Sequence, residues 1–191
     1  MAKSAAAALW DEWGRVTRYL NGARIAFARE ADLWDSLQIQ AKKDVVLEVK
    51  RGGGTFKAKL DQHLQAMKDE EMLLTSVLIH SYALSEAGAA DKLGMDIRQM
   101  GIEEWGKRLL RANDKGWSAV TGGLGGAVEV SVIRNVLAHG RRTIDQRAEN
   151  RLRAVRMNSR PNGSAITLTF DDVETYRARL RSVLRTAGIR A

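Results

Sequence analysis

Hydrophobic residues recur every three or four positions over most of the chain, the spacing of α-helices that each bury one face. The clearest case is residues 57–93, where an apolar seam runs from Leu60 to Leu84. The same spacing runs through residues 4–42, where Asn21-Gly22 could divide it into two helices. Three further segments share this spacing, namely residues 102–112, 127–138 and 171–187.

The pattern changes after residue 140. Residues 151–158 partly alternate between polar and apolar, and residues 165–170 form a second short strand pattern. Arg160-Pro161-Asn162-Gly163 lies between them and is typical of a hairpin turn. Asp171 or Asp172 is then expected to cap the last helix. The sequence therefore predicts a mainly α protein, a helical bundle with one short β-hairpin before the C-terminal helix.

A run of three glycines, Gly52-Gly53-Gly54, is the clearest candidate for a linker. The residues before it, 44–50, fit a strand or a helix equally well. We therefore expect a helical N-terminal extension over residues 1–55 and a helical domain over residues 56–191.

Composition narrows the class of partner. The chain has 191 residues, a formal net charge of +8 and no cysteine. Such a charge favours polyanions, nucleic acid before membrane. Without cysteine there are no disulfides or thiolate metal sites, and a reducing cytoplasm is the simplest location. No apolar run approaches the roughly 20 residues that span a bilayer, so no membrane association is expected.

Arginines concentrate between residues 134 and 160, where only Asp145 and Glu149 oppose them. A guanidinium group binds phosphate through two planar hydrogen bonds. The expected RNA-binding residues are Arg141, Arg142, Arg147 and Arg151, continued by Arg153 and Arg156. Codon bias in a GC-rich genome would explain the choice of Arg over Lys equally well, but it would not explain the local excess of positive charge.

The expected helix at 127–138 carries two stripes with a spacing of four. Val128, Val132 and Val136 form an apolar stripe that should pack into the bundle. The second stripe is polar and consists of Ser131, Asn135 and His139, with Arg134 beside it. The small residues Ala127 and Ala138 lie on the same side as the polar stripe, so we expect an accessible face that another molecule can approach closely.

Arg, Asn and His together suit RNA cleavage without a metal. A base must take the proton of the ribose 2′-hydroxyl, an acid must protonate the leaving 5′ oxygen, and a cation must stabilise the phosphorane. Imidazole titrates in the right range for the proton transfers, and Arg supplies a fixed charge. One His cannot easily be acid and base in one step, which indicates a homodimer with two copies of the helix. No metal and no cofactor is expected.

The segment Arg134-Asn135-Val136-Leu137-Ala138-His139-Gly140 resembles the Arg-Asn-x-x-x-His motif of HEPN domains (higher eukaryotes and prokaryotes nucleotide-binding), of the toxin, abortive-infection or RiboL-PSP-HEPN-like type. Residues 73–86 are similar to the first long helix of these domains, and Glu86 matches an acidic residue near its end. The likeness covers residues 57–187. Arg141 departs from the subgroup in which a Tyr two residues after the His is modified by a nucleotidyltransferase partner.

This resemblance implies a dimeric helical bundle with metal-independent endoribonuclease activity, in toxin–antitoxin, abortive-infection or CRISPR defence. It implies that His139 is the general acid or base and that Arg134 binds the scissile phosphate. Asn135 would orient His139 or the phosphate, and Glu86 would hold Arg134. An antitoxin or another defence protein would be a further partner.

Other features of the sequence give weaker signals. A catalytically inert HEPN module that binds RNA or a protein is the alternative to a ribonuclease. His63 and His80 lack partners arranged as a metal site, so structural roles are expected. The glycines between Gly122 and Gly126 are not followed by Gly-Lys-Ser/Thr and do not form a phosphate-binding loop.

Overall fold

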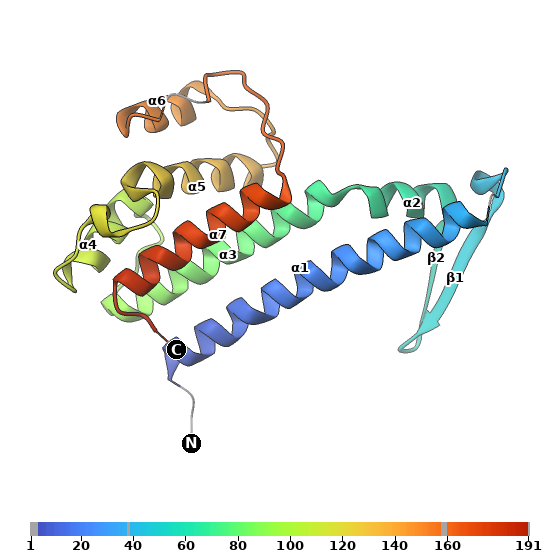
Figure 1. The fold of residues 1–191 in the computed structure, drawn as a ribbon, viewed down its shortest axis with the longest axis horizontal. Helices are drawn as coiled ribbons and strands as arrows, with labels where there is room; N and C mark the ends of the chain where they lie inside the picture. The colour runs from blue at the N-terminus through green and yellow to red at the C-terminus, as the bar shows by residue number, and fades with distance from the viewer. Residues whose placement is uncertain (1–3, 38, 158–159, 191) are drawn as a thin grey trace. The chain divides into compact units, whose positions relative to one another are not determined.

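The computed structural model describes residues 4–37, 39–157 and 160–190. Within these residues the chain forms seven α-helices and one two-stranded antiparallel sheet, which confirms the mainly α class. The elements in chain order are α1 (Ala5–Ser36), β1 (Val46–Arg51), β2 (Gly54–Lys59), α2 (Leu60–Lys68), α3 (Glu70–Leu93), α4 (Ile102–Arg111), α5 (Gly123–Ala138), α6 (Gln146–Ala154) and α7 (Phe170–Thr186) (Figure 1). Short 3-10 turns lie at Lys42–Asp44 and Trp117–Ala119.

The chain divides into two compact units, and helices α1 and α3 contribute to both. Unit 1 consists of Met1–Val16 and Leu74–Ala191, and unit 2 consists of Thr17–Leu73. The boundary expected between residues 55 and 56 falls inside strand β2, and the first turns of the chain belong to unit 1.

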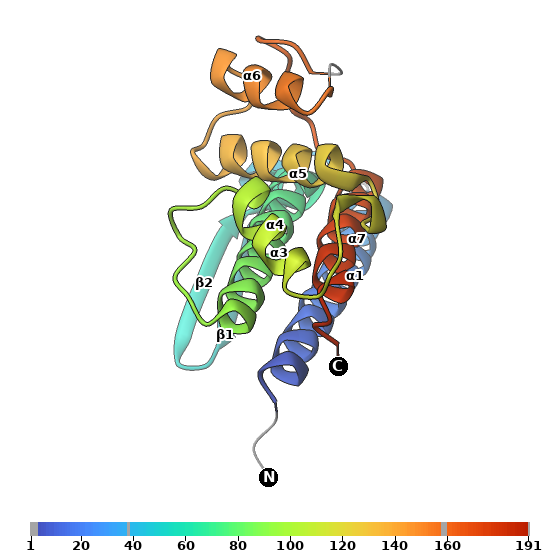
Figure 2. The same cartoon turned by 90° about the vertical axis from the view of Figure 1, so that its left-hand side faces the viewer.

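Helix α5 is the centre of unit 1. Its residues from Gly126 to Ile133 are all buried, because the helix is apolar on nearly every side and is surrounded. It packs against α4, α6 and α7, and α6 covers its side away from α4 and α7 (Figure 2). Fully buried side chains of α4, including Trp105 and Leu109, fill the space beside it. The last turn of α5 therefore emerges from a rigid core.

The structure has the single β-hairpin of the predicted fold class before the C-terminal helix, but at residues 46–59 and not at residues 151–170, where the pattern placed it. Residues 151–154 belong to helix α6 and residues 155 and 156 form a turn, and the only strand-like contact described there is an isolated bridge between Thr143 and Ala165. Asp145 caps α6 by accepting the Ala148 N–H, and Ala148 and Leu152 form its buried face. The cap at Asp145 and the buried residues Ala148 and Leu152, four positions apart, favour a helix more than the weak alternation of polar and apolar residues favours a strand. Asn158, the end of the predicted first strand, lies outside the described residues.

The glycine run is the turn of the observed hairpin and not a linker. Gly52 and Gly53 have φ angles of +58° and +81°, which a two-residue turn between antiparallel strands requires. Of residues 44–50, which were ambiguous by pattern, residues 46–50 belong to strand β1. The segment 57–93, expected to be a single helix, forms two helices, α2 and α3, which are separated at Asp69.

Two other helices differ from expectation. Thr169, not Asp171 or Asp172, is the N-cap of α7, and Asp172 completes a capping box as the third helical residue. Helix α1 continues without a break through Asn21-Gly22. In unit 2, His63 of α2 and Glu30 of α1 are 3.3 Å apart, which ties these helices together.

None of the described helices combines the length and the apolar character that crossing a bilayer requires.

Candidate functional site

The last turn of α5 presents His139 to solvent. Gly140 has a φ of +68°, and the Arg141 N–H donates to the carbonyl of Val136, so the helix ends in a left-handed cap, for which glycine is the usual residue. His139 is the residue just before this glycine and is exposed.

Arg134, one turn earlier, faces helix α3. Its Nη2 is 3.6 Å from Oε2 of Glu86, and its Nη1 donates to Oδ1 of Asn135 at 2.8 Å. Its guanidinium carbon lies 4.9 Å from the centre of the Tyr82 ring, a cation–π contact. Only a quarter of the Arg134 side chain is exposed, and Nε is buried without a hydrogen-bond partner among the described residues. Arg134 is thus held firmly by α3 and by its own neighbour.

The supporting groups have shifted pKa values. Burial raises the pKa of Glu86, and the positive charge of Arg134 acts against that rise. Burial raises the pKa of Tyr82 to about 12, so its hydroxyl stays protonated and donates to Ser131 Oγ at 3.1 Å. Tyr82 was not singled out from the sequence. It lies one turn before Glu86 on the same face of α3, and that spacing was the available signal.

Between the end of α5 and helix α6 there is a polar pocket of about 470 Å³. Its α5 wall includes Asn135 and His139, and Arg141, Arg147 and Arg151 supply positive charge. Asn135 links this pocket to Arg134, because its amide oxygen accepts the Arg134 hydrogen bond. Arg134 itself, Glu86 and Arg142 do not line the pocket.

Asp145 is the acidic group of this pocket, and the sequence did not mark it as part of the site. The Ala148 N–H that it accepts lowers the pKa of Asp145, and Arg141 at 2.9 Å lowers it further. The carboxylate therefore offsets part of the positive charge contributed by Arg141. No ion pair is described for the Arg147 side chain, which is exposed on α6.

Arg151 is engaged within the chain. It forms a two-pronged pair with Glu103 of α4, with both oxygens within 2.9 Å of its Nη2, and it donates to Ser131 Oγ at 3.3 Å. The pair with Glu103 connects α6 to α4, and the bond to Ser131 connects α6 to α5. Arg151 lines the pocket, but the carboxylate of Glu103 already neutralises part of its positive charge.

The accessible face expected on α5 is smaller than predicted. Ser131 is 2% exposed and Ala127 is 1% exposed, so both are enclosed by the chain itself. Helix α3 and α6 cover them, as the bonds of Ser131 to Tyr82 and Arg151 demonstrate. Of the small residues expected beside the polar stripe only Ala138 is exposed.

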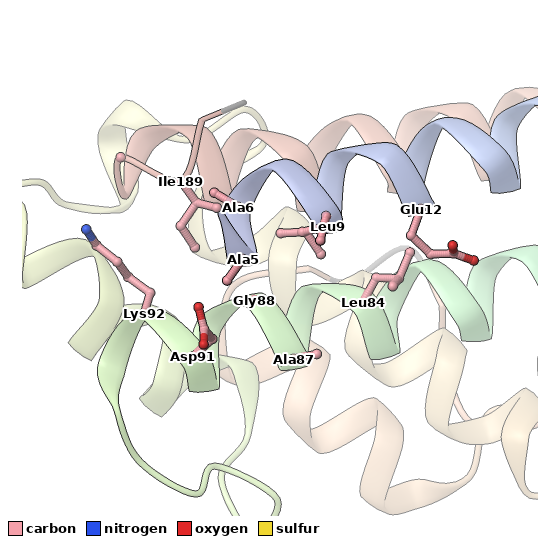
Figure 3. A pocket seen from close by; sticks show the side chains of 12 residues that line it. Ala5, Ala6, Leu9, Glu12, Leu84, Ala87, Gly88, Asp91, Lys92 and Ile189 are labelled. Carbon is pink, nitrogen blue, oxygen red and sulfur yellow. The ribbon is translucent and has the colours of Figure 1, made fainter. Parts of the chain in front are cut away.

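A second pocket of about 460 Å³ lies in unit 1, between the start of α1 and α3 (Figure 3). Small and apolar residues such as Ala5, Leu9 and Gly88 form most of its wall. Its charged groups are Glu12, Asp91 and Lys92, with neither imidazole nor guanidinium. It does not offer the groups needed for phosphate chemistry.

Neither His63 nor His80 is part of a metal-ligand cluster, and no group of three His, Cys, Asp or Glu residues suited to a metal ion is found in the described part of the chain.

No family model, curated protein or solved structure matches this chain.

Proposed function

We propose that the chain is an endoribonuclease that works without a metal ion, with His139 as its proton-transfer group. The observation that carries the proposal is the placement of an exposed imidazole in a pocket with the guanidinium groups of Arg141 and Arg147. The likeness of 134–140 to the HEPN motif supports the same reading. The pocket volume, about 470 Å³, is within the range of small-ligand sites.

The reaction follows from these groups. A base removes the proton of the ribose 2′-hydroxyl, and the 2′ oxygen forms a bond to phosphorus as the bond to the 5′ oxygen breaks. An acid gives its proton to that leaving oxygen. The products are a 2′,3′-cyclic phosphate and a 5′-hydroxyl, and DNA is not a substrate because it has no 2′-hydroxyl. Arg134 is proposed to stabilise the phosphorane, with Glu86 and Asn135 setting its position.

One copy of the chain supplies one imidazole to this site, so we propose that a homodimer supplies the second proton-transfer group. We also propose a role as a toxin or anti-phage effector in the cytoplasm, with RNA as substrate and an antitoxin or another defence protein as regulator. The excess of positive charge, +8, fits an RNA substrate.

An inert module that binds RNA or a protein is the second candidate. It is favoured by the orientation of Arg134, whose guanidinium is occupied by Glu86 and Asn135 and does not line the pocket.

The two candidates are separated by cleavage of labelled RNA by the purified chain in excess EDTA. We expect wild type to cut and His139→Ala to be slower by about the 10²–10⁴-fold typical of lost acid–base catalysis, with RNA binding nearly unchanged. His80→Ala is the matched control, because His80 is half exposed on α3 and lies outside the pocket. Cleavage abolished by EDTA rules out the mechanism. No cleavage by any variant, across several RNAs, favours the inert module.

A further inference from the structure

The pocket between the end of α5 and helix α6 has an apolar part that phosphate chemistry does not use. Val132, Val136 and Ala148 line it, and each of these side chains is less than a tenth exposed. Aliphatic groups offer a phosphate no hydrogen bond, but they can pack against the flat face of a nucleobase. The volume of about 470 Å³ exceeds what a phosphate group fills. The pocket therefore has both the space and the surface for a base.

The carboxylate of Asp145 is a fixed hydrogen-bond acceptor in this pocket. Its Oδ1 accepts the Ala148 N–H at 2.8 Å, and its Oδ2 accepts from Nη1 of Arg141 at 2.9 Å. Both partners hold the pKa of Asp145 below its usual value, so the group stays ionised. An ionised carboxylate only accepts hydrogen bonds, and it repels a phosphate. It is suited instead to the N–H groups of a base.

The bond between Asp145 and Arg141 is easily exchanged for a bond to a ligand. The Arg141 side chain is 64% exposed, and exposed ion pairs contribute little to stability. A base that donates to Oδ2 can therefore replace the guanidinium at small cost. The replaced Arg141 is then available to a phosphate of the same RNA strand.

Asn135 supplies the opposite kind of group on the α5 wall of the pocket. Its amide oxygen already accepts from Nη1 of Arg134 at 2.8 Å. The amide nitrogen, which carries two N–H donors, is therefore the group that Asn135 can offer to a ligand. A ligand that bridges the pocket meets an acceptor at Asp145 and a donor at Asn135.

Guanine has the edge that matches this pair of groups. Its Watson–Crick edge carries two adjacent donors, N1–H and the 2-amino group, beside the acceptor O6. Adenine and cytosine each offer a single amino group to a carboxylate. Uracil offers one N–H between two carbonyl oxygens, which a carboxylate repels. Unpaired bases in RNA are commonly recognised through this edge, so the pocket favours guanine and disfavours uracil.

We infer that the pocket is a guanine-binding subsite, in which Asp145 accepts from N1–H and the 2-amino group and Asn135 donates to O6. Arg147 contacts an adjoining phosphate, which sets position and not sequence. The inference rests on the proposed RNA substrate but not on cleavage, because an inert RNA-binding module would select the same base. In a ribonuclease it places the cut beside a guanosine, since His139 lines the same pocket.

The test is the binding of labelled heptanucleotides to the full chain, measured by fluorescence anisotropy. The probes are 2′-fluoro RNA, which lacks the nucleophilic hydroxyl and cannot be cut. They carry uridine at every position except the central one, which is guanosine, inosine or uridine. Inosine differs from guanosine only by loss of the 2-amino group. We expect wild type to bind the guanosine probe at least about fivefold more tightly than either of the others.

Asp145→Asn should bring these affinity ratios close to one. Asn caps a helix as well as Asp does, so α6 should keep its N-cap while the pocket loses its anionic acceptor. Asp96→Asn is the matched control. It removes the same charge from another carboxylate that pairs with an exposed arginine, Arg98, and lies outside the pocket. It should leave the ratios unchanged, and circular dichroism establishes that both variants are folded.

Each other outcome has a definite meaning. Equal binding of the guanosine and inosine probes by wild type overturns the inference, as does a preference that Asp145→Asn leaves intact; Asp145 then serves only to cap α6. Failure to bind any probe overturns both the subsite and the proposed RNA substrate. A guanine preference in a chain that cuts no ordinary RNA would contradict the proposed ribonuclease alone.

Discussion

At the scale of single residues, Arg134 is the most constrained part of the candidate site. It is positioned by an ion pair with Glu86, by the hydrogen bond that it donates to its neighbour Asn135 and by the ring of Tyr82 beneath it. Two of these three groups come from α3, so the position of a motif residue on α5 depends on another helix. The direction of the Arg134 guanidinium is therefore set by the neighbouring helix and not by the motif alone.

Tyr82 should act on Arg134 as a positioning residue. Tyr82→Leu removes the ring, and we expect the cleavage rate to fall by about threefold to tenfold, the equivalent of a partly buried cation–π contact. Tyr82→Phe keeps the ring and should restore most of the rate. Loss of its hydrogen bond to Ser131 should lower the free energy of unfolding by about 1 kcal/mol.

Tyr176→Leu is the control for Tyr82→Leu. Tyr176 is also buried and lies under an arginine, Arg179, but it contacts Glu129 and Arg160 instead of the motif. Both Leu variants should be less stable than wild type in urea. If they lower the cleavage rate equally at a temperature where both are folded, Tyr82 has only a structural role.

At the scale of elements, a glycine within a helix can mark where another side chain packs closely against the helix backbone. Gly106 in α4 lies against the indole of Trp117, and a Cβ added there would be 2.5 Å from the ring. Gly22 in α1 has no atom within 4 Å of such a Cβ. The same substitution should thus have opposite effects in two helices.

We expect Gly22→Ala to stabilise the chain by roughly 0.5–1 kcal/mol, because Ala is the better helix former and nothing opposes its methyl group. Gly106→Ala gains the same propensity but forces Trp117 to move, at a cost of about 1–3 kcal/mol. The net effect should be destabilising. Urea midpoints at constant m-value measure both changes, and equal gains from the two substitutions would show that Trp117 moves freely.

At the scale of the whole molecule, the positive charge is concentrated in unit 1, where α6 presents it on two sides. Arg147 lines the pocket beside His139, whereas Arg153 does not line it and pairs with Glu149. Both side chains are exposed on the same helix. Comparing substitutions of these two residues therefore distinguishes a phosphate contact in the pocket from the general attraction of a basic protein for RNA.

We expect Arg147→Ala to weaken RNA binding and to reduce the slope of log affinity against log salt by about 0.7, the value for one phosphate contact on a single strand. Arg153→Ala, which removes the same charge outside the pocket, should leave the slope nearly unchanged. Fluorescence anisotropy with labelled RNA across a salt series gives both slopes. Equal slopes for the two variants would mean that the pocket is not where RNA binds.

Local sequence patterns determined the helical class, helix α4 and the left-handed end of α5. They also brought Arg134, Asn135 and His139 into one turn and a half, because each of these features depends on residues within a few positions of one another. The likeness to HEPN domains added Glu86, and the structure places its carboxylate 3.6 Å from Arg134.

Tertiary structure decided between alternatives that the local sequence pattern fitted equally well. Helix α6 prevailed over the weak alternation at 151–158 because Ala148 and Leu152 are buried where α6 packs on α5. The glycine run became a turn because the strands on both sides of it pair. Burial of Ser131 and the addition of Tyr82 to the site depend on contacts between helices distant in sequence. Side-chain spacing along one helix does not contain those contacts, since they form only when the helices pack.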